Sequence, residues 1–257
     1  MKRLFCVVMF MIFVMTGCGS EETADCVRIF ADSSLTEALN AAIDAYKEEH
    51  PVNIEIVSGS TSSLYKRIEE GVDCDIFIPS SKEQINSLIE DDLLEEENVT
   101  PILENDVVLI KKLDSNLTVK SFDTAAEAKS IAIANEGEPA GDFAREIFIN
   151  LNVFKDVLKM NTSNYEDSPS VVNAVIEGKC DVGVCFETDA LAQADKVQII
   201  AAEPKDSLNS EAVYSVALLK GENGIDPDEN TKNVAEYLDS PEAAQIFAGY
   251  DFGIYIS

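Results

Sequence analysis

The sequence predicts an α/β protein built as two similar lobes. Short apolar segments typical of buried strands alternate along the chain with segments whose apolar residues recur at helical spacing. This alternation indicates parallel sheets covered by helices on both faces. In addition, residues 68–76 resemble residues 176–182, because each segment runs from a helix end through a glycine and a Cys-Asp pair into a strand. Two lobes built to one plan would produce such an echo.

The strand and helix patterns of the first lobe begin at residue 27. Leu35, Leu39 and Ile43 recur every four residues and give one helix its apolar stripe, and Leu64 and Ile68 do the same for the next. The predicted elements are strand 27–30, helix 35–46, strand 52–57, helix 63–70, strand 75–78 and helix 82–89. The acidic stretch 90–97 that follows is interpreted as a solvated connector without function.

The second half of the chain repeats the alternation. Its predicted elements are strands 107–110, 131–134 and 181–185 and helices 140–149 and 170–177. Ligands of open α/β sheets bind beyond the carboxyl ends of the strands, where the following helices begin. Residues with hydroxyls or exposed backbone N–H groups stand at those places, in segments 31–37, 58–63, 135–141 and 167–171. Helix N-termini with such donors favour anions, although Ser34 and Ser168 are also ordinary helix-capping residues.

Charge and composition exclude several classes of function. The chain has 48 acidic and 19 basic residues and a formal net charge of −29, which argues against binding to a nucleic-acid backbone. Its content of 46% hydrophobic and 26% charged residues is that of a globular protein. A hydrolase using Ser34 or Cys185 would need a base, and the only histidine, His50, stands at a predicted helix end. We therefore expect neither an enzyme nor a bound cofactor.

The amino terminus predicts export and lipidation. Lys2 and Arg3 precede an apolar run of 12 residues, 4–15, which is shorter than the ~20 residues of a membrane-spanning helix and fits a signal peptide. Small residues then lead to Cys18, in a pattern that resembles the lipobox of bacterial lipoproteins. This predicts a signal peptide at 1–17, a lipidated tether at 18–24 and an extracytoplasmic protein anchored to the cell membrane. The alternative is a plain secretory signal with an incidental cysteine.

Four cysteines remain in the body of the chain, Cys26, Cys74, Cys180 and Cys185. Cys180 and Cys185 flank one strand, which holds them ~16 Å apart and prevents a bridge between them. Cys26 and Cys74 start two strands, and a Cys26–Cys74 disulfide is feasible if these strands are parallel neighbours. The alternative is four small buried thiols. No Cys-x-x-Cys spacing occurs, so a metal site is not expected.

Several motifs resemble the periplasmic molybdate-binding proteins of ABC importers. The resemblance covers nearly the whole chain in order, through residues 30–36, 60–68, 75–78, 139–141, 183–190 and 241–247. It implies the type II periplasmic-binding-protein fold, with two α/β lobes of mainly parallel sheet flanked by helices. The lobes would comprise residues 25–105 with 217–257, and 106–216, with crossover strands at 107–110 and 214–218. It also implies a monomer that delivers molybdate or tungstate to a membrane permease and its ATPase.

The resemblance also implies a ligand site of uncharged donors. The donors that it implies are the hydroxyls of Ser34 and of Thr61 or Ser60, and the backbone N–H groups of Ala140 and Val171.

Two residues depart from the family pattern. Phe186 stands where the family usually has a tyrosine whose hydroxyl would contact the ligand. Asp32 stands where a small neutral residue is common, and a carboxylate there would repel a dianion unless it points outward. A different oxyanion, or a cationic ligand such as iron or a polyamine, is therefore the alternative.

Overall fold

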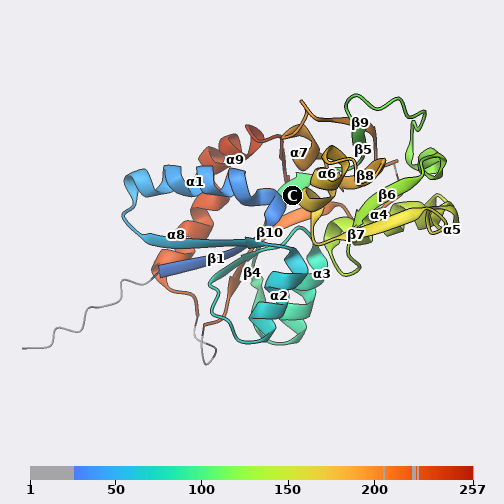
Figure 1. The fold of residues 1–257 in the computed structure, drawn as a ribbon. Helices are drawn as coiled ribbons and strands as arrows, with labels where there is room; N and C mark the ends of the chain where they lie inside the picture. The colour runs from blue at the N-terminus through green and yellow to red at the C-terminus, as the bar shows by residue number, and fades with distance from the viewer. Residues whose placement is uncertain (1–25, 205, 222–223, 225, 257) are drawn as a thin grey trace, which may run out of the picture.

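The computed structural model describes residues 26–204, 206–221, 224 and 226–256, and their strands form two sheets in two lobes (Figure 1). The predicted signal peptide, Cys18 and the tether lie outside the described residues. The first sheet has the order β11-β4-β10-β3-β1-β2. Its strands are β1 (Cys26–Asp32), β2 (Asn53–Gly59), β3 (Ile76–Ile78), β4 (Leu94–Asn105), β10 (Ala212–Leu219) and β11 (Gly253–Ile254).

Helices cover both faces of this first sheet because the strands alternate their side chains. Val27, Ile29 and Ala31 of β1 face one apolar cluster, and Phe30 faces the other. The first cluster is closed by η1 (Ser33–Leu35), α1 (Thr36–Glu49), α8 (Glu229–Leu238) and α9 (Pro241–Ala248). The second is closed by α2 (Thr61–Glu69) and α3 (Lys82–Glu90).

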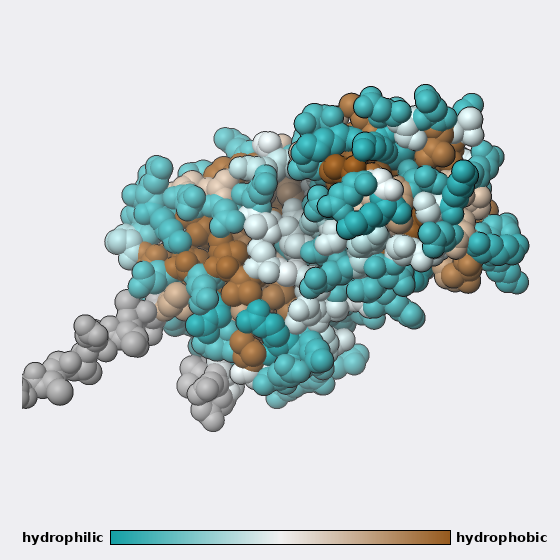
Figure 2. All heavy atoms as spheres, viewed as in Figure 1, coloured by the Kyte–Doolittle hydropathy of each residue, from teal (hydrophilic) through white to brown (hydrophobic). Residues whose placement is uncertain are grey.

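The second lobe has a five-stranded sheet in the order β7-β6-β8-β5-β9 around one core. Its strands are β5 (Val107–Lys112), β6 (Ser130–Ala134), β7 (Asn161–Tyr165), β8 (Val182–Phe186) and β9 (Val197–Ala202). Its helices are η2 (Phe122–Glu127), α4 (Pro139–Asn150), α5 (Phe154–Val157), α6 (Ser168–Ile176) and α7 (Glu187–Leu191). Hydrophilic residues cover most of the visible face of this lobe (Figure 2).

The two lobes share one plan, as the sequence echo predicted. The order β2-β1-β3 in the first sheet matches β7-β6-β8 in the second, and all four of these pairings are parallel. Gly71 and Gly178, just after α2 and α6, have positive φ of 82° and 72°. The aspartates that follow also have equal roles, because Asp75 accepts a hydrogen bond from the Arg28 amide (2.7 Å) and Asp181 from the Lys129 amide (2.9 Å).

The remaining strands make both sheets mixed rather than mainly parallel. β5 and β10, which contain the predicted crossover segments, pair antiparallel with their neighbours. The chain passes from β4 to β5 at Asp106 and returns between β9 and β10. The predicted lobe boundary at 216/217 lies inside β10, and pairing with β4 from Ala212 places this strand entirely in the first sheet.

Two further sequence expectations are wrong. Half of the acidic stretch 90–97 belongs to β4, where Leu94 pairs with Leu219 of β10, although Glu95, Glu96 and Glu97 of this strand are exposed. The disulfide is absent as well, since Cys26 and Cys74 are both free although β1 and β3 are parallel neighbours. Cys26 is exposed at the start of β1, whereas Cys74 is buried and its thiol donates to the Ile76 carbonyl.

No helix in the described ranges combines the length and the apolar character needed to cross a membrane.

Candidate functional site

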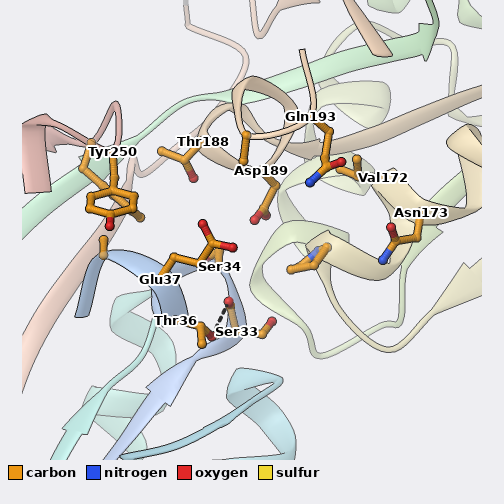
Figure 3. A pocket seen from close by; sticks show the side chains of 14 residues that line it. Ser33, Ser34, Thr36, Glu37, Val172, Asn173, Thr188, Asp189, Gln193 and Tyr250 are labelled. Atoms are coloured by element: carbon orange, nitrogen blue, oxygen red, sulfur yellow. Dashed lines mark hydrogen bonds between the residues drawn. The ribbon is translucent and has the colours of Figure 1, made fainter. Parts of the chain in front are cut away.

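A cleft of about 250 Å³ lies between the lobes (Figure 3). The first lobe contributes the start of α1 and the segment before β11, and the second contributes the starts of α6 and α7. The lining residues are Ser33, Ser34, Thr36, Glu37, Ala38, Pro169, Val172, Asn173, Thr188, Asp189, Ala192, Gln193, Tyr250 and Phe252. Figure 3 shows Glu37 and Asp189 pointing toward one another across it. This lining contains no lysine or arginine.

Four donors of the first lobe converge on the Asp32 carboxylate beside the cleft. The amide and the hydroxyl of Ser34 donate to Oδ1 at 3.0 and 2.6 Å. The Thr61 and Ser80 hydroxyls donate to Oδ2 at 2.6 and 3.0 Å. These donors stand where β1, β2 and β3 end, which is the edge of the sheet that the sequence predicted to carry the site. Asp32 is 5% exposed and therefore points inward.

Tyr214 adds a hydroxyl to this cluster from the middle of the first lobe. Its Oη lies 2.6 Å from Ser34 Oγ, and because Ser34 gives its proton to Asp32, Tyr214 is the donor in that contact. Asn105 Nδ2 donates to Tyr214 Oη (3.3 Å) and to the Thr188 hydroxyl of the second lobe (2.9 Å). A continuous hydrogen-bond chain thus leads from the lobe interface to Asp32.

A second carboxylate joins the lobes at the start of α2. Glu138, the residue before α4, accepts hydrogen bonds from the amide (3.3 Å) and the hydroxyl of Ser62. Glu138 is 4% exposed, although it comes from the second lobe and its partner from the first. The N-terminal donors of α2 are therefore bound to an anion that the chain itself supplies.

The residues predicted from the sequence are brought together in part. Ser34 and Thr61 contact the same carboxylate, but the Ser60 hydroxyl caps α2 by accepting from the Ser63 amide (3.4 Å). Ala140 is buried in the first turn of α4, beside Glu138. The Val171 amide, predicted to donate to a ligand, donates to the Asp167 carbonyl at 3.2 Å.

Phe186 is buried and has no polar role. Its ring packs between Phe143 and Tyr214, with centroids 6.4 and 6.1 Å away. Its own amide donates to the Ser168 hydroxyl, which donates in turn to Asp189 (2.5 Å). The hydroxyl that the family pattern places at this position is thus lacking at Phe186, while Tyr214 brings a hydroxyl to Ser34 from another strand.

Sequence reasoning missed Ser33, Ser80, Tyr214 and Glu138. Ser80 follows β3 directly, so the rule that found Ser34 and Thr61 could have found it. Ser33 lines the cleft, and its buried hydroxyl has no hydrogen-bond partner among the described residues. Tyr214 lies inside a strand, where no local pattern marks it.

The expected helix caps are also different. The side chain of Ser34 binds Asp32 rather than forming a capping box, and Asp167 rather than Ser168 caps α6. In both places an aspartate carboxylate takes the capping position that the sequence analysis gave to a serine.

Burial raises the pKa of the carboxyl groups around the cleft. Desolvation is the main cause for Asp32 and Glu138, and the donated hydrogen bonds oppose it. The same cause raises the pKa of Asp189 to about 8 against the hydrogen bond from Ser168. The described residues contain no group of three or more histidine, cysteine, aspartate or glutamate side chains that could hold a metal ion.

Comparison with known proteins assigns this architecture to a family. Residues 27–253 match the family described as bacterial extracellular solute-binding protein. YvgL of Bacillus subtilis, which carries the provisional name of an ABC transporter substrate-binding lipoprotein, is 28% identical over 97% of this chain and 96% of its own length. The molybdate-binding protein ModA of Haemophilus influenzae is 31% identical over 88% of this chain and 89% of its own.

A solved structure agrees with these relatives. The substrate-binding domain of a provisionally named molybdenum ABC transporter from Clostridium difficile is 29% identical, has a TM-score of 0.69, and is matched over 90% of this chain and 99% of that one. These relatives are binding proteins of transport systems, not enzymes. The chain therefore belongs to the bacterial extracellular solute-binding proteins and is the solute-binding component of an ABC transporter.

Proposed function

We propose that the protein captures molybdate or tungstate between its lobes and delivers it to an ABC permease driven by an ATPase. The observation that carries this proposal is the convergence of the Ser34 and Thr61 hydroxyls, from two separate helix starts, on the two oxygens of one carboxylate. Donors that hold two oxygens of a carboxylate are suited to a tetrahedral oxyanion, because short charge-assisted hydrogen bonds bind both. The molybdate-binding name of a relative 31% identical supports the choice of oxyanion.

A calorimetric titration panel tests the proposal. The purified protein would be titrated with molybdate, tungstate, sulfate, ferric citrate and spermidine. We expect binding heat with molybdate and tungstate, which share charge and shape. Binding of sulfate alone would keep an oxyanion site but change its ligand, and binding of neither molybdate nor tungstate would refute the proposal.

Replacing Ser34 by alanine is expected to weaken molybdate binding with little effect on the fold. The substitution removes one hydroxyl donor from the cluster, and a hydrogen bond to a charged partner contributes ~1.5–3 kcal/mol, so we expect a loss of about 10-fold or more. Titration of the Ser34→Ala variant measures it. Ser87→Ala is the matched control, because that hydroxyl donates to the Glu83 carbonyl within α3 and does not line the cleft. Equal affinities of the two variants would remove Ser34 from the site.

A cationic solute is the second candidate. It is favoured by the inward carboxylate of Asp32, by Glu138, and by a cleft lined with Glu37 and Asp189 but with no lysine or arginine. In the same titration panel this candidate predicts heat with spermidine or ferric citrate and none with the oxyanions.

We further propose that lipid on Cys18 anchors the protein at the outer face of the cell membrane. This is supported by YvgL, which aligns with this chain over 96% of its own length and whose name includes the word lipoprotein. We expect radioactive palmitate to label the wild-type protein and Cys18→Ser to abolish both the label and the retention in the membrane fraction. Cys26→Ser is the control, since Cys26 is exposed in the folded body. Unchanged membrane retention of Cys18→Ser would show that the anchor is elsewhere.

A further inference from the structure

The hydroxyl donors at the proposed oxyanion site already hold an anion of the chain itself. Both oxygens of Asp32 are occupied, one by the amide and hydroxyl of Ser34 and the other by the hydroxyls of Thr61 and Ser80. The Ser80 amide points at Thr61 Oγ1 as well (3.4 Å). Since each hydroxyl has one proton to give, Ser34, Thr61 and Ser80 cannot donate to Asp32 and to a bound oxyanion at the same time.

Glu138 is a second internal carboxylate that holds donors of the first lobe, and it does so from the second lobe. Glu138 of the second lobe accepts hydrogen bonds from the amide and hydroxyl of Ser62, one residue beyond Thr61 in the first lobe. The two helix starts of the first lobe are thus both satisfied by internal carboxylates. Ser33, whose buried hydroxyl is unpartnered among the described residues, still offers a hydroxyl to the cleft, and so does Thr188, whose hydroxyl accepts from Asn105.

We propose that Asp32 is the specificity-determining residue of this site, a built-in anion that must be protonated or displaced before a dianionic ligand reaches Ser34 and Thr61. The inference rests on the proposed function, which it deepens. When Asp32 takes up a proton from solvent, its carboxyl becomes a donor, and the Thr61 and Ser80 hydroxyls can turn to the ligand. Capture of a dianion is then coupled to the uptake of one proton by Asp32.

The surroundings of Asp32 set the direction of the pH dependence. The titratable groups that face it are Tyr214 of β10, Asp189 of α7 and Glu138 before α4, and all are acids. Burial raises the pKa of Asp32, so its protonated form becomes available above the usual carboxylate range. A dianion should therefore bind more tightly as the pH falls.

Calorimetry with tungstate on the wild type, Asp32→Ala and Asp32→Asn tests this between about pH 6 and pH 8, the range above ordinary carboxylate pKa values. We expect wild-type affinity to fall with rising pH, by at most about 10-fold per pH unit for one proton. At the upper pH, Asp32→Ala should bind tungstate at least about 10-fold more tightly than the wild type, because the hydroxyls freed from Asp32 can donate to the charged ligand. Both variants should lose the part of the pH dependence and of the proton uptake that Asp32 contributes, as measured in buffers of different ionisation enthalpy, whereas the part contributed by Asp189, whose pKa is about 8, should remain in all three proteins.

Asp75→Asn is the matched control, since this half-buried carboxylate accepts from Arg28 at the opposite end of β1 and should leave binding unchanged. Asp32→Asn retains an acceptor for the Ser34 amide, so it reports on charge even if Asp32→Ala folds poorly. Equal binding by the wild type and both variants overturns the inference and leaves the proposed function standing. Weaker tungstate binding by both variants overturns it, because Asp32 would then position the donors for the oxyanion rather than compete with it. An absence of oxyanion binding in all three proteins overturns the proposed function as well.

Discussion

Replacing Gly141 by alanine is expected to destabilise the protein by ~3 kcal/mol or more, the upper end of the cost of overpacking. A Cβ at this position would lie 2.3 Å from the Asn135 carbonyl oxygen and 2.5 Å from that of Ala134. Both are backbone atoms that follow or end β6, so no side chain can turn away to make room. Relief requires the first turn of α4 to move off the sheet, and that turn contains Ala140 and adjoins Glu138.

Thermal and urea unfolding measure the loss, which corresponds to a decrease of ~10 °C in the unfolding midpoint at 2–4 °C per kcal/mol. Gly59→Ala is the control, because a Cβ there would meet the Leu64 side chain at an ordinary 3.4 Å. The displaced turn should also weaken ligand binding in Gly141→Ala but not in Gly59→Ala. Equal stability of the two variants would mean that α4 can shift without cost. The short distance to the carbonyls of Ala134 and Asn135 would then not be the reason for a glycine at position 141.

Local patterns predicted the elements of the first lobe as far as α3 and several of the second lobe, because burial and helical spacing are local properties, but β7, β9, α8 and α9 were not predicted. The helix predicted at 82–89 is Lys82–Glu90, and the strand predicted at 131–134 is Ser130–Ala134. β4 was not predicted, since its start reads as a run of charge and its pairing with β10 and, at its end, with β11 is not visible in the local sequence. Those partners lie more than 100 residues away in the sequence, so strand order and the mixed character of the sheets were beyond local reasoning.

The hydrogen-bond cluster around Asp32 could be anticipated where it depends on strand ends, and it was missed where it depends on the orientation of side chains. Ser34 and Thr61 follow β1 and β2, and the structure brings them to one point. Tyr214 reaches the same point only because β10 lies beside β3. The inward turn of Asp32 could not be inferred, because the residue has two good partners, solvent and the Ser34 amide. The inward orientation, toward the Ser34 amide, is favoured by the hydroxyls of Thr61 and Ser80, which are 29 and 48 residues away in the sequence.

Asp189 is expected to make the protein less stable as the pH rises from about 4 to about 8. Its pKa in the folded state is raised to about 8 from an ordinary value of 3.8, mainly by burial. Across this range the unfolded chain releases a proton that the folded chain retains, so the equilibrium shifts toward unfolding. At about 1.4 kcal/mol per pKa unit, the decrease attributable to Asp189 reaches ~5 kcal/mol at the upper end and is absent below the lower end.

Asp189→Asn isolates this contribution. The amide oxygen still accepts from Ser168, but the side chain stays neutral at every pH, so the variant should gain stability over the wild type progressively as the pH rises. Urea unfolding followed by circular dichroism at several pH values gives the difference between the two curves, in which the other carboxylates cancel. Asp195→Asn, at an exposed position just beyond α7, should run parallel to the wild type. If Asp189→Asn also runs parallel, then Asp189 ionises as readily in the folded protein as in the unfolded chain, and the buried wall of the cleft carries its full negative charge at neutral pH.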